Sequence, residues 1–383
     1  MSRAAIFAAL GLLALSCADE GGPMRISDGP VVVDTTARPP ELLSDMRALQ
    51  WNAETQTIEY NDRVVAYDLN TPLFSDYALK ARAVYLPEGQ AMSYDADGVF
   101  RFPVGAAIFK TFYFPADLRE PDANITLIET RVLIHTEDGW EAWPYVWNEE
   151  QTEAVLDLGG ESRAISFVDA EGASQTASYL IPQRNQCSSC HERNLGEGGE
   201  PVISPIGPAA RNLNRDYDYG DGPTNQLAHL AGLGMLDGMP DLGSVPAAYD
   251  FTEVMASGAD VVPDAEVEFA ARSYLDINCA HCHDAQGTQG VTSQLFLNHD
   301  NDDTFRLGFC KRPGSAGAGT GGLTYDIVPG DPDQSILVFR VETTEVGAMM
   351  PLLGRSLQHA NGAALVRRWV ANMDPVDCDM MME

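Results

Sequence analysis

The sequence predicts an α+β protein of several domains, with an antiparallel β-rich N-terminal domain followed by two mainly α-helical modules. Residues 41–180 contain short β-branched and aromatic runs separated by Gly, Pro and Asp, which is typical of an antiparallel sandwich or barrel. Apolar residues then recur at helical spacing in 181–255 and in 256–383, and each region contains one C-x-x-C-H pentapeptide. With 383 residues and 45% hydrophobic content, the chain can build more than one core.

The N-terminus has the pattern of an export signal. A positively charged start precedes the apolar run Ala4–Leu15, which is too short to span a membrane. The residues before Cys17 resemble a bacterial lipoprotein signal, in which the cysteine becomes acylated, although Ala14 stands where Leu is usual. An ordinary signal peptide that ends near Cys17 is the alternative. We expect a signal peptide over 1–17, a flexible tether over 18–40, and lipid attachment through Cys17 in the periplasm or at the outer membrane.

The composition is strongly acidic. The chain contains 24 Lys and Arg against 56 Asp and Glu, which gives a formal net charge of −32. This charge argues against nucleic acid and anionic membrane surfaces as partners. A basic partner protein would be attracted, but the acidic surface could equally serve only to keep the protein in solution.

Four apolar runs within 41–180 are predicted as strands: Arg63–Tyr67, Ala83–Leu86, Ile108–Phe114 and Thr130–Ile134. Trp140, Trp143 and Trp147 follow across one further turn and are expected in the core rather than in a substrate or electron-relay patch. Lys110 and His135 stand in apolar strands, where alternation predicts that they face solvent on the polar side.

The two pentapeptides carry the chemistry of the sequence. In C-x-x-C-H, each thiol adds to one vinyl group of the same haem, and the adjacent histidine binds the iron as its proximal ligand. A structural zinc site would need four Cys or His ligands in pairs, and neither pair has a partner at the usual spacing. We therefore predict two covalently bound haem c groups, one in each module. The first is held by Cys187, Cys190 and His191 in 181–255, and the second by Cys279, Cys282 and His283 in 256–383.

The sequence does not determine the sixth ligand of the first haem iron. Met239 is a candidate because Pro240 follows it. Met235 lies on a short predicted helix and is expected in the core, whereas His229 on the same helix would give coordination by two histidines. The iron could also lack a protein ligand and remain open to peroxide or another small molecule.

The second module has the order helix, C-x-x-C-H, long loop, Met-Pro and terminal helix, which resembles a class I cytochrome c domain. The resemblance implies His283 as the proximal ligand and Met350, before a proline, as the distal ligand. Met349 is the alternative, or both methionines only pack in the core. His281 is expected at the surface or between the haems, and His359 in solvent.

Two cysteines remain after these assignments. Cys310 and Cys378 form a candidate disulfide, because an exported protein meets an oxidising compartment. The alternative is that they are separate buried thiols.

Several stretches of the chain together resemble a family of bacterial dihaem c-type cytochromes that join a β-rich N-terminal region to two haem motifs. The resemblance covers nearly the whole mature chain and implies haem binding and electron transfer, but it defines no substrate. The stretches are Thr71–Tyr77, Phe102–Gly105, Glu129–Arg131, Gly139-Trp140, Gln186–His191, Leu213–Tyr217 and Asn278–His283.

We therefore expect a dihaem electron carrier of the cell envelope that exchanges electrons with a redox partner protein. A haem enzyme, either a peroxidase or a dehydrogenase subunit with an open first haem, is the alternative. A third hypothesis is a binding module in which the β-rich domain docks a partner dehydrogenase.

Overall fold

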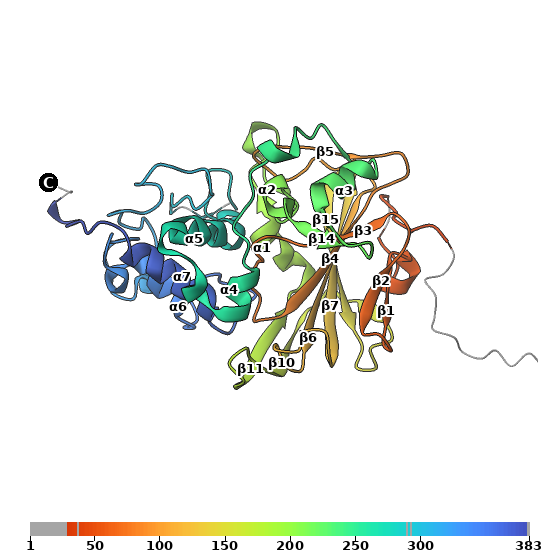
Figure 1. Cartoon of the computed structure of the whole chain (residues 1–383), viewed down its shortest axis with the longest axis horizontal. Coiled ribbons are helices and arrows are strands. Elements are labelled where there is room, and N and C mark those ends of the chain that lie inside the picture. The colour runs from red at the N-terminus through yellow and green to blue at the C-terminus, as the bar shows by residue number, and fades with distance from the viewer. Residues whose placement is uncertain (1–28, 37, 289, 292, 381–383) are drawn as a thin grey trace, which may run out of the picture.

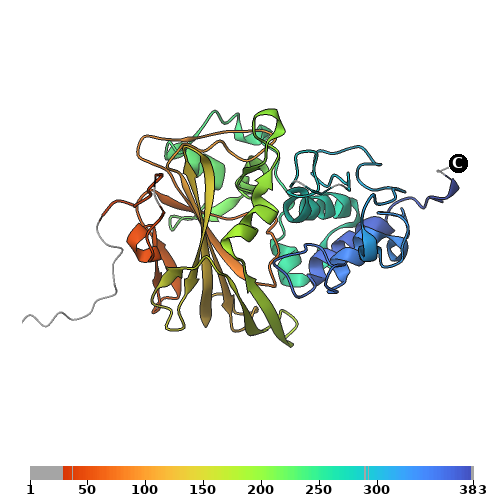
Figure 2. The ribbon, with the colours of Figure 1, turned by 180° about the vertical axis from the view of Figure 1, so that it is seen from behind.

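The computed structural model of the chain describes residues 29–36, 38–288, 290–291 and 293–380. A β-rich part and a part built from helices and loops lie side by side, with the hairpin β1–β2 and helices α5 to α7 toward opposite ends (Figure 1, Figure 2). The predicted signal peptide, its Cys17 and residues 18–28 of the predicted tether lie outside the described residues. Within the described ranges, no helix combines the length and hydropathy needed to cross a bilayer.

The β-rich part is built around a six-stranded antiparallel sheet with the strand order β3-β4-β6-β7-β8-β9. The strands are β3 (Val64–Tyr67), β4 (Leu79–Tyr85), β6 (Ala107–Pro115), β7 (Ile125–Thr136), β8 (Gly139–Trp147) and β9 (Ala154–Leu156). Each of the four predicted strands is present. β-branched and aromatic residues fit the pleated surface of such a sheet. The predicted antiparallel β-rich region is confirmed.

Both faces of the sheet are covered by other parts of the chain. One face, which carries Phe109 and Tyr145, packs against the N-terminal segment. The opposite face, which carries Ile108 and Leu133, packs against residues from 181–255. A polar side chain on either face of the sheet can therefore be covered by another part of the chain. The covering elements include η1 (Leu43–Met46), β1 (Leu49–Asn52), β2 (Thr57–Tyr60), β5 (Met92–Ser93), β10 (Glu161–Val168) and β11 (Ser174–Ile181).

Residues 181–255 are not mainly helical, which corrects the prediction for the first module. The longest helix of this region, α3 (Gln226–Gly232), has seven residues. Segments this short cannot bury a core alone, so Leu227 and Leu230 join the apolar cluster on the sheet. The other elements are η2 (Arg184–Cys187), α1 (Ser188–His191), β12 (Glu192–Arg193), η3 (Glu197–Gly199), β13 (Val202–Ile203), α2 (Ala210–Leu213), β14 (Asp216–Asp218), β15 (Pro223–Asn225), β16 (Leu236–Asp237), η4 (Leu242–Ser244) and α4 (Thr252–Ser257).

Residues 256–380 contain the helices that their apolar spacing predicted. Helices α5 (Val267–Leu275), α6 (Ile336–Glu342) and α7 (Ala360–Ala371) enclose one apolar cluster that includes Trp369. The predicted disulfide is confirmed, because Cys310 and Cys378 are bonded with their Cα atoms 5.0 Å apart. The shorter elements are η5 (Ala259–Val261), η6 (Asp264–Glu266), η7 (Asp276–Ala280), η8 (Gly317–Thr320) and η9 (Pro332–Gln334).

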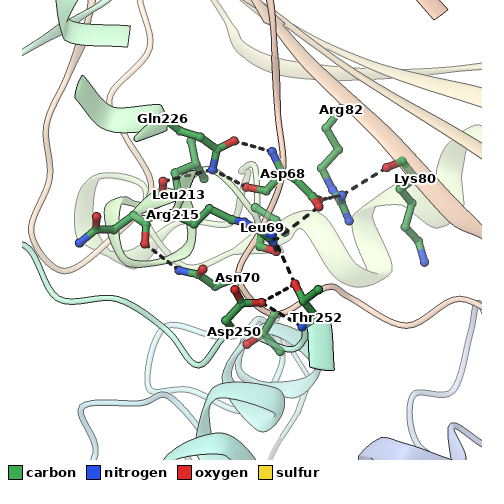
Figure 3. Close-up of polar contacts among 12 residues, drawn as sticks. Asp68, Leu69, Asn70, Lys80, Arg82, Leu213, Arg215, Gln226, Asp250 and Thr252 are labelled. Carbon is green, nitrogen blue, oxygen red and sulfur yellow. Dashed lines mark hydrogen bonds and ion pairs between the residues drawn. The ribbon is translucent and has the colours of Figure 1, made fainter. Parts of the chain in front are cut away.

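The segment Asp68–Tyr77 joins the sheet to both motif-bearing regions. The buried side chain of Gln226 donates from its amide to the carbonyl of Asp68 and accepts from the Asp68 amide (Figure 3). The backbone amide of Phe74 donates to Asn278 Oδ1 at 2.8 Å. In both contacts, backbone groups of the segment bond to side chains that are distant in the sequence. The position of the segment therefore depends on how those distant parts of the chain fold.

The aromatic residues of β8 are only partly as predicted. Trp143 and Trp147 are buried in the core, which confirms the prediction for them. Trp140 is half-buried, and its ring stacks on His135 with the centroids 4.8 Å apart. His135, predicted to face solvent, is therefore half-buried, because the Trp140 ring covers one of its faces.

Candidate functional site

The first C-x-x-C-H motif forms a helical turn over η2 and α1. Residues three and four apart lie on the same side of a helix, so Cys187, Cys190 and His191 all line one cavity. Both thiols are free, and burial raises their pKa, for Cys190 to about 11. They are therefore neutral thiols at neutral pH.

The His191 ring is oriented by a backbone carbonyl. Its Nδ1 lies 2.8 Å from the carbonyl oxygen of Ser204. Because that oxygen can only accept, Nδ1 carries the hydrogen and Nε2 keeps its lone pair. Burial lowers the pKa of His191 to about 4, which keeps the ring neutral. Metal-binding histidines are commonly oriented in this way.

The cavity beside the first motif is partly open to solvent and mostly apolar. It encloses about 1400 Å³ of empty space, its open mouth included. The space inside it that a water-sized sphere can reach is about 150 Å³. Ligand sites in proteins range over roughly 300–1,000 Å³, so side chains of the wall would have to move to admit a tetrapyrrole. The apolar walls come from the sheet, the segment between β3 and β4, the loop after β13, η7 and the second motif, and the loop before α7; they include Leu73, Ile108, Leu133, Ile206, Ile277 and Leu353.

The second motif follows α5 through a π-helical turn, η7. The backbone amide of His283 donates to the Cys279 carbonyl at 2.9 Å, which continues the helical turn. His283 Nδ1 lies 3.2 Å from Ser293 Oγ. Burial, followed by the charges of Arg340 and Lys311, lowers the pKa of His283 to about 4. Cys279 packs against the apolar cluster of α5 to α7.

The two motifs touch each other directly. Cys282 Sγ lies 3.6 Å from the carbonyl oxygen of Ser189, which belongs to the first motif. Immediately beyond the motifs, Arg193 forms an ion pair with Asp284 at 3.3 Å. The backbone amide of Asn194 also donates to the Gln286 carbonyl at 3.0 Å. Both candidate attachment sites therefore belong to one continuous structure, although their proximal histidines, His191 and His283, are 92 positions apart in the sequence.

The methionine and histidine candidates of the first module lie away from its cavity. Met235 and Met239 belong to the apolar cluster between 181–255 and the sheet, and neither lines the cavity. His229 stacks on Tyr219 with the ring centroids 3.6 Å apart. Ligation of the first iron by Met239 remains a prediction, and it would require Met239 to approach the cavity.

Met350 does not itself line the cavity of the first motif, but its backbone contacts are defined. Its backbone amide donates to the Arg340 carbonyl at 2.9 Å, and the Arg340 guanidinium acts on the pKa of His283. The following residue, Pro351, lines the cavity of the first motif. Met349 and Met350 are both half-buried, so ligation of the second iron by Met350 remains a prediction.

His281 and His359 are both buried. His281 is 7% exposed, lines the cavity of the first motif, and its Nδ1 has no hydrogen-bond partner among the described residues. A surface position is therefore wrong for His281, while a position between the two motifs agrees with the structure. His359 is 3% exposed, stacks on Phe74 and has its Nδ1 3.1 Å from the hydroxyl of Tyr274. The solvated position predicted for His359 is wrong, because aromatic rings surround it.

Three cations in the cavity wall were missed by sequence reasoning. Arg82, Lys110 and Arg131 come from neighbouring strands and line the cavity. The solvent-facing position predicted for Lys110 is wrong, since residues from other parts of the chain cover its face of the sheet. The alternation of polar and apolar residues in these strands showed that the three cations share one face of the sheet. It could not show which parts of the chain cover that face.

Comparisons of the chain with protein-family models, curated proteins and solved structures give no match. Within the described part of the chain, no group of three or more His, Cys, Asp or Glu side chains is arranged to hold a metal ion. The site has to be interpreted from its own chemistry.

Proposed function

We propose that this chain is a dihaem c-type cytochrome that transfers electrons at the cell envelope. The observation that carries the proposal is the direct contact between two C-x-x-C-H motifs, at Cys282 Sγ and the Ser189 carbonyl. Haem iron supplies one-electron chemistry when it is bound. Two adjacent attachment sites would suit passage of an electron through the protein.

The residues of the first motif fit a haem. Cys187 and Cys190 are free thiols in the wall of a cavity, and His191 has an oriented ring whose Nε2 keeps its lone pair. Thioether attachment needs two such thiols and a proximal imidazole. The apolar walls would exclude water and so help to set a reduction potential.

The order of helices around the second motif supports the proposal that it forms a class I cytochrome c arrangement. Cys279 and Cys282 follow α5, and α7 closes the same apolar cluster. A soft thioether ligand from Met350 would favour the ferrous state and raise the potential. Two mainly α-helical haem modules are not needed for this proposal, since the sheet completes the first site.

The cellular setting belongs to the same proposal. Thioether-linked haem is attached outside the cytoplasm, and the first 17 residues have the pattern of an export signal that ends at Cys17. We propose a lipid-anchored protein in the periplasm or at the outer membrane, related to the bacterial dihaem cytochromes that its motifs resemble.

The proposal is tested by counting haems in protein matured in a host that attaches haem c. Mass spectrometry and the pyridine haemochrome assay should give two haems per chain. The double variant Cys187→Ser/Cys190→Ser should lose one haem, and so should Cys279→Ser/Cys282→Ser. The matched control Cys310→Ser/Cys378→Ser removes two cysteines outside the motifs and should keep both haems. Wild-type protein without added tetrapyrrole mass would disprove the proposal.

A second candidate function is a haem enzyme with an open first iron. It is favoured by one observation, that Met235, Met239 and His229 do not line the cavity of the first motif. Ferric spectra separate the two functions. A carrier should show low-spin iron at both haems, whereas a high-spin component that binds cyanide or turns over peroxide would indicate the enzyme.

A further inference from the structure

A row of cations crosses the sheet in the wall of the first cavity. Arg82 of β4 stands opposite Lys110 of β6, and Lys110 stands opposite Arg131 of β7. All three side chains line the cavity. Like charges in directly opposite positions destabilise a sheet, so a bound anion would stabilise this row.

The surrounding charges do not balance the row. The cavity is lined by three cations and by no Asp or Glu, in a chain with 24 Lys and Arg against 56 Asp and Glu. Arg131 pairs with buried Glu129 at 2.6 Å, and Arg82 pairs with Asp68 at 2.5 Å (Figure 3). The fourth cation on this face, Lys80, lies in the next row and outside the cavity wall. The three cations of the row and these two carboxylates leave one positive charge unbalanced.

Lys110, at the centre of the row, lacks an ionic partner. Among the described residues, no carboxylate lies within ion-pair distance of its ammonium group, which instead lies 4.9 Å from the ring centroid of Phe112. The neighbouring Arg82 has a side chain that is 4% exposed, and its Nη2 has no hydrogen-bond partner in the described structure. Burial and the charges of Arg82 and Arg131 lower the pKa of Lys110, as expected for a cation without its anion.

We propose that Arg82, Lys110 and Arg131 form a carboxylate-binding site, and that its ligand is a propionate of the haem attached at Cys187 and Cys190. The inference rests on the proposed function. A haem brings two propionates, one of which would match the unbalanced charge, and guanidinium and ammonium groups are the usual partners of carboxylates. Lys110, Arg131 and His191 all line the same cavity, so the row and the proximal histidine face the same space.

The test uses the full-length, haem-loaded protein and the variant Lys110→Met. We expect two haems per chain, a shift of the haem propionate bending band in the resonance Raman spectrum, and a lower reduction potential for one haem. The potential falls because removing a positive charge near the iron favours the ferric state. The rescue variant Lys110→Arg should restore the band and most of the potential.

The matched control is Lys80→Met, which removes the same charge from the same sheet face but outside the cavity wall. Its Nζ donates to the Ala78 carbonyl at 2.7 Å, so it should leave the propionate band unchanged and shift the potential less. If Lys110→Met does not accumulate, Lys110→Gln replaces it. An unchanged band and potential in a variant that keeps both haems would overturn the inference and leave the proposed function standing. Wild-type protein to which no haem is attached would instead disprove the proposed function.

Two further results identify other roles for the row. A saturable change of the wild-type spectrum on adding formate, absent in Lys110→Met and without a propionate band shift, would overturn the propionate assignment in favour of a free carboxylate. High-spin iron in Lys110→Met would also overturn it, because Lys110 would then be an axial ligand.

Discussion

At the scale of single residues, hydrogen-bond partners distinguish the histidines more clearly than their positions in the motifs do. His191 has its Nδ1 bonded to the Ser204 carbonyl and its Nε2 available. His281 has a buried Nδ1 without a partner in the described structure. The motif predicts the proximal role of the first, but only the packed structure shows that His281 faces the cavity of the other motif.

The buried His359 should make the stability of the protein depend on pH. Burial lowers its pKa to about 3, against about 6.5 in an unfolded chain. Below pH 6.5 the unfolded state therefore binds the additional proton, so the free energy of unfolding falls as the pH falls toward 3. From pH 7.5 to 5 this one group should cost about 2 kcal/mol. His359→Phe keeps an aromatic ring beside Phe74 and should lack that loss in urea unfolding. Equal pH slopes for the variant and the wild type would contradict the prediction.

Met350 is the proposed sulfur ligand of the second haem iron. Met350→Ala should abolish any weak sulfur-to-iron absorption band and lower one of the two reduction potentials, because a thioether ligand stabilises ferrous iron. Met239→Ala is the comparison, since Met239 lies in the apolar cluster on the sheet and should leave that band intact. If Met350→Ala changes nothing and Met349→Ala removes the band, the ligand is Met349.

At the scale of elements, amphipathic spacing predicted the helices that carry their own core. Helices α5 and α7 bury one side each in a shared cluster, and a helical stripe of apolar residues is local information. The elements of 181–255 are too short to bury a core of their own, so the apolar side of α3, with Leu227 and Leu230, depends on the sheet for burial. Their arrangement could not be predicted because it is set by contacts far apart in sequence.

Hydrogen bonds of Gln226 link α3 to the segment after β3. Its side chain is fully buried and bonds to the amide and carbonyl of Asp68 and to the Leu213 carbonyl. Gln226→Leu leaves these backbone groups without partners and should lower the free energy of unfolding by about 2–3 kcal/mol. The control Gln90→Leu changes an exposed glutamine and should have little effect. Denaturant unfolding of both variants checks this, and equal midpoints would show that the bridge is dispensable.

At the scale of the whole molecule, the charge distribution is uneven. The chain carries a net charge of −32, yet the cavity of the first motif is lined by cations and by no acidic residue. An acidic exterior attracts basic proteins over distances set by the ionic strength. A cationic interior wall is instead suited to an anion that belongs to the folded protein.

Electron exchange with a basic redox protein should therefore depend on salt. The second-order rate constant for reduction by a basic cytochrome should fall by about tenfold or more between low and high salt, since screening removes electrostatic steering. The rate with anionic ferricyanide should rise under the same conditions, because repulsion is screened instead. Stopped-flow kinetics measure both, and a flat salt dependence with the basic partner would favour an acidic surface that serves solubility alone.

The sequence by itself determined the features that depend on neighbouring residues. The spacing of Cys187, Cys190 and His191 brings them to one side of a helical turn, and β-branched alternation produces the strands of the sheet. Only the tertiary structure decided which surfaces meet: the contact of the two motifs, the inward position of His281 and the cationic row at Lys110. The physical reason is that a short-range pattern fixes the direction of a side chain relative to its own element, whereas its environment is fixed by the elements that pack over it.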